Sequence, residues 1–480
     1  MHSPSKRGKV LRCRRGMWVA CCSAVAVLPF ARAREAPEPS PAAPAFKLFR
    51  FDEDYRYLED PAKRIDAQDA IKYIPLGQSD WYLSLGGELR ERFEFYSRPG
   101  LGLQGQGADG YLLQRVLFHA DFHAGENFRT FVQIGSHLAP GKEAAAPPYL
   151  DRLDIQQAFV DVQLAPASDV KSDAIVRIGR QEMAFGSQRL VSIRDAPNVR
   201  RNFDGVRLSG AIEDRRLDAF LTRPVQLRRG AFDDPSDRTQ AFWGLYAVNP
   251  IDVVAGSKLD LYYFGFKNDR ARFAAGTGEE RRQTVGARFF GASMGWDWDW
   301  EALGQFGTFR QQEIRAFGVS TDTGYTLNAV NQKVRVGLKA DVGSGDRDAS
   351  DSTVGTLNPL FPKLAYFNQA ALLGPSNVIQ LQPTLGFKPA QELGVNVGYG
   401  FLWRANTADA IYTGAGVPIS GTAGLPGRFT ARQFSIDLTW KPDRHVDING
   451  GYVRLNPAEA LRTAGGKSVD FIYLSAAYKF

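Results

Sequence analysis

Arginine is concentrated in residues 174–210, the part of the sequence where residue types and spacing carry the clearest chemistry. A guanidinium group is planar, stays charged, and donates two hydrogen bonds to one carboxylate. Several such groups, each held by a nearby carboxylate, offer an acidic ligand many weak contacts and no single site strong enough to hold it. The centre of the stretch, residues 183–203, carries too much charge for a buried core loop. We interpret it as a loop that lines or constricts an aqueous passage.

Two alternating runs flank this loop and would position its arginines. In residues 174–181, Val176 and Ile178 share one parity and Arg177 lies on the other. Residues 206–212 repeat the pattern. Because the side chains of a strand point to alternate faces, this period of two predicts strands with one apolar and one polar face.

The first 33 residues have the features of a secretory signal peptide. Six basic residues precede residue 16, an apolar run covers residues 17–30, and residues 31–33 form an A-x-A cleavage site. The apolar run is too short to remain as a membrane span. A lipoprotein alternative through Cys21 fits less well, because its apolar run would follow the cysteine instead of preceding it. The sequence therefore predicts export.

Removal of residues 1–33 changes what the composition indicates. The whole chain has 59 Lys/Arg and 52 Asp/Glu. Seven of the basic residues and all three cysteines lie in residues 1–33, so 447 thiol-free residues with 52 charges of each sign remain. A net charge near zero gives no basis for a nucleic-acid partner. The lack of thiols is compatible with a periplasmic route.

The remaining chain is predicted to be all-β. No apolar run after residue 33 approaches the roughly twenty residues of a transmembrane helix, so the choice lies between a soluble all-β protein and a membrane β-barrel. In residues 81–95, one face carries two acidic and two basic side chains and must be wet. The candidate strands number about eighteen: 81–95, 111–123, 127–137, 153–164, 173–182, 204–212, 215–223, 240–248, 258–267, 281–291, 295–307, 313–323, 332–343, 377–387, 391–404, 428–441, 444–454 and 469–480.

The connections favour the single transmembrane antiparallel barrel, in which short periplasmic turns alternate with long extracellular loops. In a soluble β-sandwich, nothing requires short and long connections to alternate in this way. The connection at 308–312 is short for an extracellular loop, and an error in the assigned strand register is the alternative there. The tight turns are 125–126, 213–214, 388–389 and 442–443, and the long loops are 97–110, 138–152, 183–203, 224–239, 268–280, 344–376, 405–427 and 455–468.

Two features indicate contact with lipid. Trp296, Trp298 and Trp300 share one face while the aspartates between them share the other, as expected for an interfacial aromatic girdle outside and charge inside. A tryptophan-rich sandwich core is the alternative. The chain also ends on Phe480, at the end of an alternating run, which is typical of the closing strand of outer-membrane barrels. We therefore expect a signal peptide (1–33), a disordered spacer with an N-terminal periplasmic or lumenal segment (34–80), and a barrel (81–480).

Three groups of residues resemble the alginate-export family of bacterial outer-membrane proteins. They are the N-terminal run from residues 51–55 through 72–76 to 85–92, the pair 179–181 and 202–208, and the pair 358–362 and 366–367. The resemblance covers most of residues 46–480. It implies an eighteen-stranded barrel whose arginine-rich lumen conducts an anionic polysaccharide outward. The resemblance does not establish alginate itself as the cargo.

The predicted pore-lining residues come from strand parity, from the charged loop and from the resemblance. Arg180 has the opposite parity to Arg177 and is included only because the resemblance implies it. A structural role in arginine–carboxylate ladders is the alternative for each residue. The predicted set is Arg90, Arg92, Glu94, Arg115, Arg177, Arg180, Gln181, Arg189, Arg201, Asp204, Arg207, Lys333, Arg335 and Lys339.

Signatures of an enzyme are weak. His119 and His123 on one strand would lie about 13 Å apart, at about 3.3 Å per residue, too far for one metal. Residues 100–105 match G-x-G-x-x-G, but they precede a strand and lack the helix that would hold a phosphate. Asp121 and His123 share a lumenal face and remain a weak catalytic alternative. We predict no enzymatic activity, no cofactor and no metal.

We therefore expect an outer-membrane channel that conducts an anionic polysaccharide or oligosaccharide of the alginate type outward. An uptake porin for small anionic or sugar-acid solutes is one alternative, and a barrel with structural or adhesive surface loops is another. The expected partners are the saccharide, outer-membrane lipid, the barrel-assembly machinery and periplasmic export proteins, with no nucleic acid.

Overall fold

Alternating strands pair with one another until the last strand meets the first. The computed structural model describes residues 44–78, 80–103, 105–143, 145–164, 172–251, 253–327 and 333–480, with the side chains of residues 172 and 173 excepted. The predicted signal peptide and residues 34–43 lie outside the described residues.

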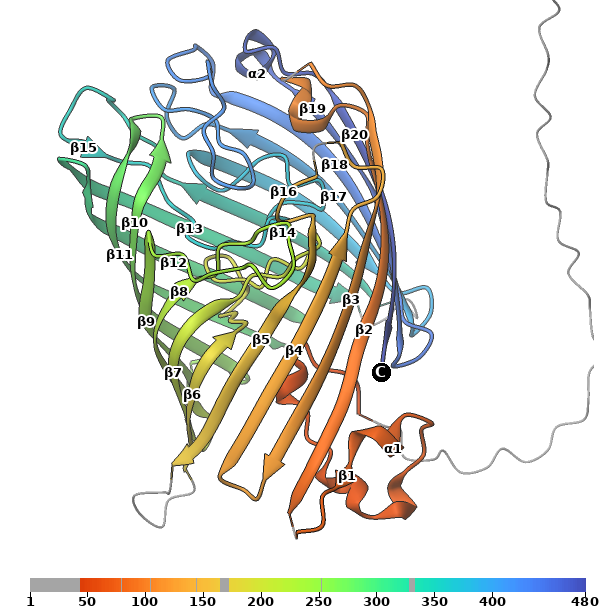
Figure 1. Cartoon of the computed structure of the whole chain (residues 1–480). Coiled ribbons are helices and arrows are strands. Elements are labelled where there is room, and N and C mark those ends of the chain that lie inside the picture. The colour runs from red at the N-terminus through yellow and green to blue at the C-terminus, as the bar shows by residue number, and fades with distance from the viewer. Residues whose placement is uncertain are drawn as a thin grey trace, which may run out of the picture. The chain divides into compact units, whose positions relative to one another are not determined.

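Eighteen antiparallel strands form the wall, which confirms the predicted barrel. Strand β2 pairs with both β3 and β20, and this contact closes the ring. In Figure 1 the orange β2 lies beside the dark-blue β20. The strands are β2 (Trp81–Tyr96), β3 (Asp109–Ala124), β4 (Phe128–Leu138), β5 (Asp151–Leu164), β6 (Ser172–Gln181), β7 (Phe203–Ile212), β8 (Arg215–Pro224), β9 (Gln240–Ile251), β10 (Ser257–Phe273), β11 (Gly276–Ser293), β12 (Trp296–Phe309), β13 (Gln312–Leu327), β14 (Val334–Gly343), β16 (Val378–Phe387), β17 (Leu393–Trp403), β18 (Phe429–Trp440), β19 (Val446–Pro457) and β20 (Val469–Lys479).

The remaining elements are short. Strand β1 (Ile74–Pro75) pairs with β2, and β15 (Thr353–Val354) pairs with β13. None of the helices in the described ranges is long and apolar enough to cross a membrane. They are α1 (Asp69–Lys72), α2 (Glu459–Thr463) and the 3-10 helices η1 (Arg50–Asp52), η2 (Arg56–Glu59), η3 (Pro61–Lys63) and η4 (Pro99–Gly102).

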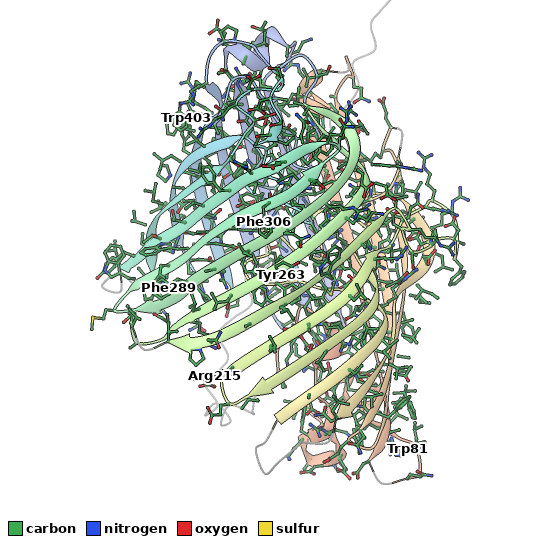
Figure 2. All side chains as sticks on the ribbon, turned by 90° about the vertical axis from the view of Figure 1, so that its left-hand side faces the viewer. Trp81, Arg215, Tyr263, Phe289, Phe306 and Trp403 are labelled. Atoms are coloured by element: carbon green, nitrogen blue, oxygen red, sulfur yellow. The ribbon has the colours of Figure 1, made fainter. Side chains whose placement is uncertain are left out.

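The two faces of the wall differ as the alternation predicts. On β12, Trp296 and Trp300 are exposed on the outer face, while Asp297 and Asp299 form ion pairs with basic side chains. Phe306 continues the outer face and is labelled on this wall in Figure 2. Apolar side chains outside and ion pairs inside are the arrangement expected for a barrel surrounded by lipid.

The two ends of the barrel differ in their connections. At one end, called the turn end, β7 and β8 are joined by residues 213–214, and β11 and β12 by residues 294–295. Glu213 and Met294 adopt positive φ angles of 54° and 52°, as two-residue hairpins require. At the other end, called the loop end, the long connections are 97–108, 139–150, 182–202, 225–239, 344–377, 404–428 and 458–468.

Two connections at the loop end are short. The predicted long loop at 268–280 is wrong, because β10 and β11 continue to a turn at residues 274–275. Ala271 and Phe273 are buried there against Tyr412 of the 404–428 loop. The short connection at 308–312 is a tight hairpin turn at residues 310–311. The register between β12 and β13 therefore needs no change.

One side of the barrel interior is filled by aromatic side chains. Strands β7–β10 contribute a cluster on their inner faces, and two loops cover it. Phe185, from the 182–202 loop, stacks on Tyr246 with ring centroids 4.8 Å apart, and Phe361, from the 344–377 loop, contacts Phe242 at 4.9 Å. The two loops therefore lie inside the ring of strands.

The N-terminal segment packs against the turn end. Arg50 donates hydrogen bonds to the carbonyl oxygens of Gly87 and Phe480, both at 2.9 Å, and so spans the seam between β2 and β20. Phe51 lies against Arg177, whose guanidinium carbon is 4.0 Å from the ring centroid. Lys72 is fully buried and donates to the Leu85 carbonyl oxygen at 2.8 Å. Arg50, Phe51 and Lys72 thus attach this segment to the inner face of the wall at the turn end.

Candidate functional site: a cation-rich lumen cavity

A cavity of about 660 Å³ lies between the wall formed by β18, β19, β20 and β2 and the two inserted loops. We call it the lumen cavity. Eight Lys/Arg but only four Asp/Glu line it, so its formal charge is positive although residues 34–480 are nearly neutral. The charged lining residues are Lys47, Arg50, Arg90, Arg92, Arg200, Lys363, Lys441, Lys479, Glu88, Asp195, Asp437 and Asp447.

Asp195 attaches the 182–202 loop to the wall of the lumen cavity. Its carboxylate accepts hydrogen bonds from Arg115 and Arg200, both at 2.7 Å. Arg90 donates to the main-chain oxygens of Asp195 and Pro197, at 2.9 and 2.6 Å. Burial alone would raise the pKa of the Asp195 carboxyl, but these three arginines hold it well below its usual value. The loop therefore stays attached at neutral pH.

The same loop is attached to a second part of the wall through Arg189. The guanidinium donates to Asp299 at 2.8 Å and to Glu301 at 2.9 Å, both on the inner face of β12. Arg288 on β11 holds Asp299 from its other side at 2.9 Å. Because Asp195 is bound to β2 and β3 while Arg189 is bound to β12, the loop crosses the lumen.

A main-chain contact joins the two inserted loops. Val191 and Phe361 form a parallel bridge, in which the Phe361 amide donates to the Leu190 carbonyl oxygen at 2.8 Å. The Ser192 amide donates to the Phe361 carbonyl oxygen at 3.0 Å. The two inserted loops therefore form one connected unit, which the sequence could not show.

Lys363 is a cation of the lumen cavity without an ion pair among the described residues. No carboxylate of the described ranges lies within ion-pairing distance of its ammonium group. Burial, followed by the nearby charges of Lys339 and Arg189, lowers the pKa of Lys363 to about 8. Lys363 is therefore mostly charged at neutral pH and lacks a partner that would cancel its field.

Most of the strand arginines predicted by parity lie on the inner face, and carboxylates bind them. Such pairs stiffen the wall and cancel part of the positive charge. Lys339 differs, because its side chain is 44% exposed and its ammonium lies 3.5 Å from Asp322. The pairs are Arg92–Glu94 (2.6 Å), Arg115–Glu88 (3.1 Å), Arg177–Asp161 (2.7 Å), Arg207–Asp218 (2.7 Å) and Arg335–Asp322 (2.9 Å).

Other predicted residues lie outside the lumen cavity. Arg180 and Asp204 pair at 2.8 Å on the same parity as the exposed Ile178 and Val206, so they do not line the lumen. Lys333 is exposed at the turn end, immediately before β14.

Two predicted residues lie where the 182–202 loop joins β6 and β7. Gln181 is completely buried, and neither of its side-chain polar atoms has a hydrogen-bond partner in the described structure. The Arg201 guanidinium carbon lies 5.1 Å from the ring centroid of Phe361. Neither residue lines the lumen cavity.

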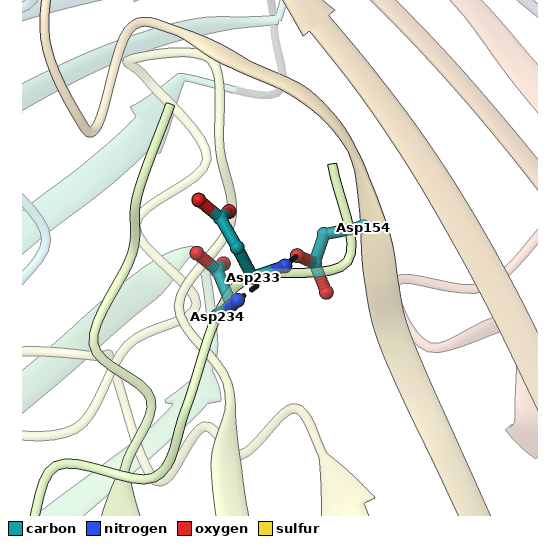
Figure 3. A group of neighbouring side chains, drawn as sticks. All are labelled: Asp154, Asp233 and Asp234. Atoms are coloured by element: carbon teal, nitrogen blue, oxygen red, sulfur yellow. Dashed lines mark hydrogen bonds between the residues drawn. The ribbon is translucent and has the colours of Figure 1, made fainter. Parts of the chain in front are cut away.

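Three aspartates meet where the 225–239 loop contacts β5 (Figure 3). Ligand atoms of Asp154, Asp233 and Asp234 lie within 4.8 Å of one another. The Asp154 carboxylate accepts hydrogen bonds from the main-chain amides of Asp233 and Asp234, at 2.8 and 3.1 Å. Arg180 lies 3.5 Å from Asp154. These contacts account for the cluster as an attachment of the loop to the wall.

The histidine pair does not form a catalytic arrangement. Asp121 is bound by Arg129 at 2.5 Å and lies 3.2 Å from His123. His119 is buried and stacks on Phe131, with ring centroids 5.2 Å apart. Both contacts are those of packed structural residues.

The comparison with protein families decides where this barrel belongs. The family described as alginate export matches residues 81–475, which is most of the chain. The chain belongs to the alginate export family. It is a bacterial outer-membrane β-barrel channel, as the sequence predicted. No curated protein matches the sequence significantly.

Solved porins share the fold of this alginate export family member. A BenF-like porin from Pseudomonas fluorescens Pf-5 is 11% identical, with a TM-score of 0.56, and the match covers 83% of this chain and 98% of that chain. OpdO of Pseudomonas aeruginosa is 13% identical, with a TM-score of 0.54 and coverage of 83% and 97%. OpdK of Pseudomonas aeruginosa, solved with vanillate, is 12% identical, with a TM-score of 0.54 and coverage of 82% and 98%. At these identities the likeness establishes the fold alone.

Several cavity residues were absent from the predicted set. Lys441 and Lys479 were assigned to no face, although Lys479 shares the inward parity of Tyr473 and Ser475. Arg50 and Lys47 lie in a segment without a strand pattern, so parity could not place them. Lys363 lies in a long loop whose path depends on tertiary contacts.

Proposed function

We propose that this channel conducts an alginate-like polysaccharide, or oligosaccharides derived from it, outward through the lumen cavity. The observation that carries the proposal is the excess of cations in the cavity, with Lys363 lacking a carboxylate partner. Each sugar of a polyuronate carries one carboxylate. A narrow pore with low-dielectric walls focuses the field of its fixed charges on passing ions, even when the net charge of the protein is near zero.

Several weak contacts suit a moving chain better than one strong site. Arg92, Arg200 and Lys479 already pair with carboxylates of the wall, so a passing uronate can replace one contact at a time without leaving a buried charge unpaired. No enzymatic step is part of the proposal. Recognition of the terminal strand by the assembly machinery and delivery of the chain by periplasmic export proteins belong to the same proposal.

Selectivity of the pore tests this function. Lys363→Gln is expected to shift the reversal potential in a salt gradient away from anion preference. In the wild type, anion preference is expected to fall as the pH rises through about 8, because Lys363 then loses its proton. The variant should lack that step. Lys267→Gln is the matched control, because Lys267 is paired with Asp269 and lies outside the cavity lining. A cation-preferring wild-type channel would contradict the proposal.

Uptake of small carboxylates is a second candidate, and the inserted loops favour it. They confine the lumen cavity to one side of the barrel, which narrows the passage for a polymer. The fold-related OpdK was solved with vanillate, a small aromatic carboxylate. Both candidates require an anion-preferring pore, and they differ in the length of solute that enters.

A further inference from the structure

A second hollow lies on the outside of the barrel, at the loop end. Its volume is about 800 Å³, and four Lys/Arg but only one carboxylate line it. The 458–468 connection and the neighbouring ends of β18 and β19 form its walls. We call it the rim pocket. Its charged residues are Arg98, Arg432, Arg462, Lys467 and Glu459.

The four cations of the rim pocket lie together without acidic partners in the part of the chain that the structure describes. Within the described ranges, none of the four forms an ion pair. Among the residues that the structure describes, the one side-chain hydrogen bond made by these four runs from Arg98 to the Ser468 carbonyl oxygen, at 2.9 Å. Arg454 lies on the neighbouring strand β19, two residues from the position opposite Arg432, and it is paired with Asp470 at 2.7 Å. Unpaired cations held together repel one another unless an anion joins them.

Two of the four side chains, Arg98 and Lys467, lie on either side of one glycine. A Cβ atom on Gly102 would lie 3.5 Å from the Cδ atoms of both Arg98 and Lys467, so these two stems flank one glycine. The Arg432 guanidinium carbon lies 5.9 Å from the ring centroid of Phe429. All four cations are exposed, so their charged groups are available to a ligand.

The position of the rim pocket identifies the kind of anion. Arg432 lies on the same parity of β18 as the exposed Leu438 and Trp440, so it faces outward. Trp440 and Phe429 are eleven residues apart on this strand. At about 3.4 Å per residue and a tilt of about 40°, they are about 28 Å apart across the membrane, close to the height of the apolar band.

Aromatic side chains mark the upper border of that band beside the rim pocket. Trp403 and Phe429 have ring centroids 5.6 Å apart, and Figure 2 shows Trp403 toward the loop end. Such aromatic girdles lie at the level of lipid headgroups. The rim pocket therefore lies where headgroups of the leaflet at the loop end meet the wall, and not where solutes leave the lumen.

We propose that the rim pocket binds the phosphate groups of a phosphorylated glycolipid in the membrane leaflet at the loop end. Arg432 and Arg462 donate charge-assisted hydrogen bonds to phosphate oxygens, and Arg98 and Lys467 add their charges. The acyl chains of such a lipid would lie along the outer face of β18 and β19. A bound lipid would also hold the 458–468 connection against the wall.

Lipid binding to the purified full-length channel tests the proposal. The probe is diphosphorylated lipid A, measured by native mass spectrometry against its dephosphorylated form. The double variant Arg432→Gln with Arg462→Gln is expected to bind diphosphorylated lipid A about 30-fold more weakly, at about fivefold per cation near an anionic headgroup. The control pair Arg281→Gln with Arg315→Gln removes two exposed arginines that have carboxylate partners and should bind normally.

The binding results either contradict the proposal or identify a different anion in the rim pocket. Equal binding of the two lipid forms by the wild type, or unchanged binding by the double variant, would overturn the proposal. Competition by sodium phosphate at the concentration of the lipid would make the pocket a free-anion site, and competition by an oligouronate would assign it to saccharide. A heat-shifted gel band confirms that each variant is folded before it is measured.

Discussion

Replacement of Phe185 and Phe361 by alanine is expected to raise the single-channel conductance several-fold, more than any exchange of a charged lumen residue. These two rings anchor the two inserted loops in the aromatic cluster on β7–β10. Truncation of a buried phenylalanine costs about 3–5 kcal/mol, so the double variant removes the largest apolar contacts of both loops with the wall. Because a main-chain bridge joins the loops, they should leave the lumen together.

Conductance in planar bilayers measures this effect. The control is Phe306→Ala with Phe317→Ala, which removes two lipid-facing rings of the same size that are 49% and 47% exposed. The control should keep the wild-type conductance, because its rings do not touch the loops. An unchanged conductance in the Phe185/Phe361 variant would show that the arginine contacts alone keep the two inserted loops in place.

The second large effect concerns stability. Arg282→Met is expected to lower the free energy of unfolding by about 3–5 kcal/mol, because it leaves a buried charge without its partner. Arg282 and Glu280 are both completely buried, and their ion pair measures 2.5 Å. Arg282 also donates to Gln305 at 2.8 Å, so its loss disturbs the inner face of β12 as well.

The neighbouring pair supplies a matched control. Arg281 and Glu279 have the same spacing and the same 2.5 Å ion pair, but they are 65% and 46% exposed. Arg281→Met should cost no more than about 1 kcal/mol. Urea unfolding in lipid vesicles measures both variants. Similar losses for the two would mean that burial does not decide the contribution of these pairs.

The barrel could be predicted because its wall obeys local rules. A period of two fixes which side chains face lipid, and WDWDW on β12 shows this most clearly, since its tryptophans and aspartates separate onto opposite faces. Tight turns such as 213–214 set the register of the neighbouring strands. These signals need no knowledge of distant contacts.

The failure at 268–280 has a physical reason. There β10 and β11 extend beyond the lipid, so the outer face becomes charged, with Arg270 and Arg272 exposed. The inner face stays apolar, because Ala271 and Phe273 pack beneath the 404–428 loop. The prediction assumes that every strand faces lipid along its whole length. Charged residues on the outer face are therefore interpreted as a loop.

The candidate site was harder to predict than the wall. Arg180 shows that parity was the better guide, since its parity opposed that of Arg177 in the sequence and the structure places it outside the lumen. The aromatic residues on both faces of residues 240–248 and 258–267 were a signal for something inside the barrel. Lys363 could not be placed, because its loop enters the lumen only through contacts distant in sequence.

Single-channel recording with oligouronates of defined length tests the central claim most directly. An uronate oligomer added at the turn end should interrupt the current under the voltage that draws anions toward the loop end, while a neutral maltooligosaccharide of equal length should not. For long oligomers, the interruptions should shorten as the voltage rises, because the chain then passes through. Equal interruption by the neutral oligomer, or exclusion of every uronate longer than a disaccharide, would contradict a conduit for acidic polysaccharide.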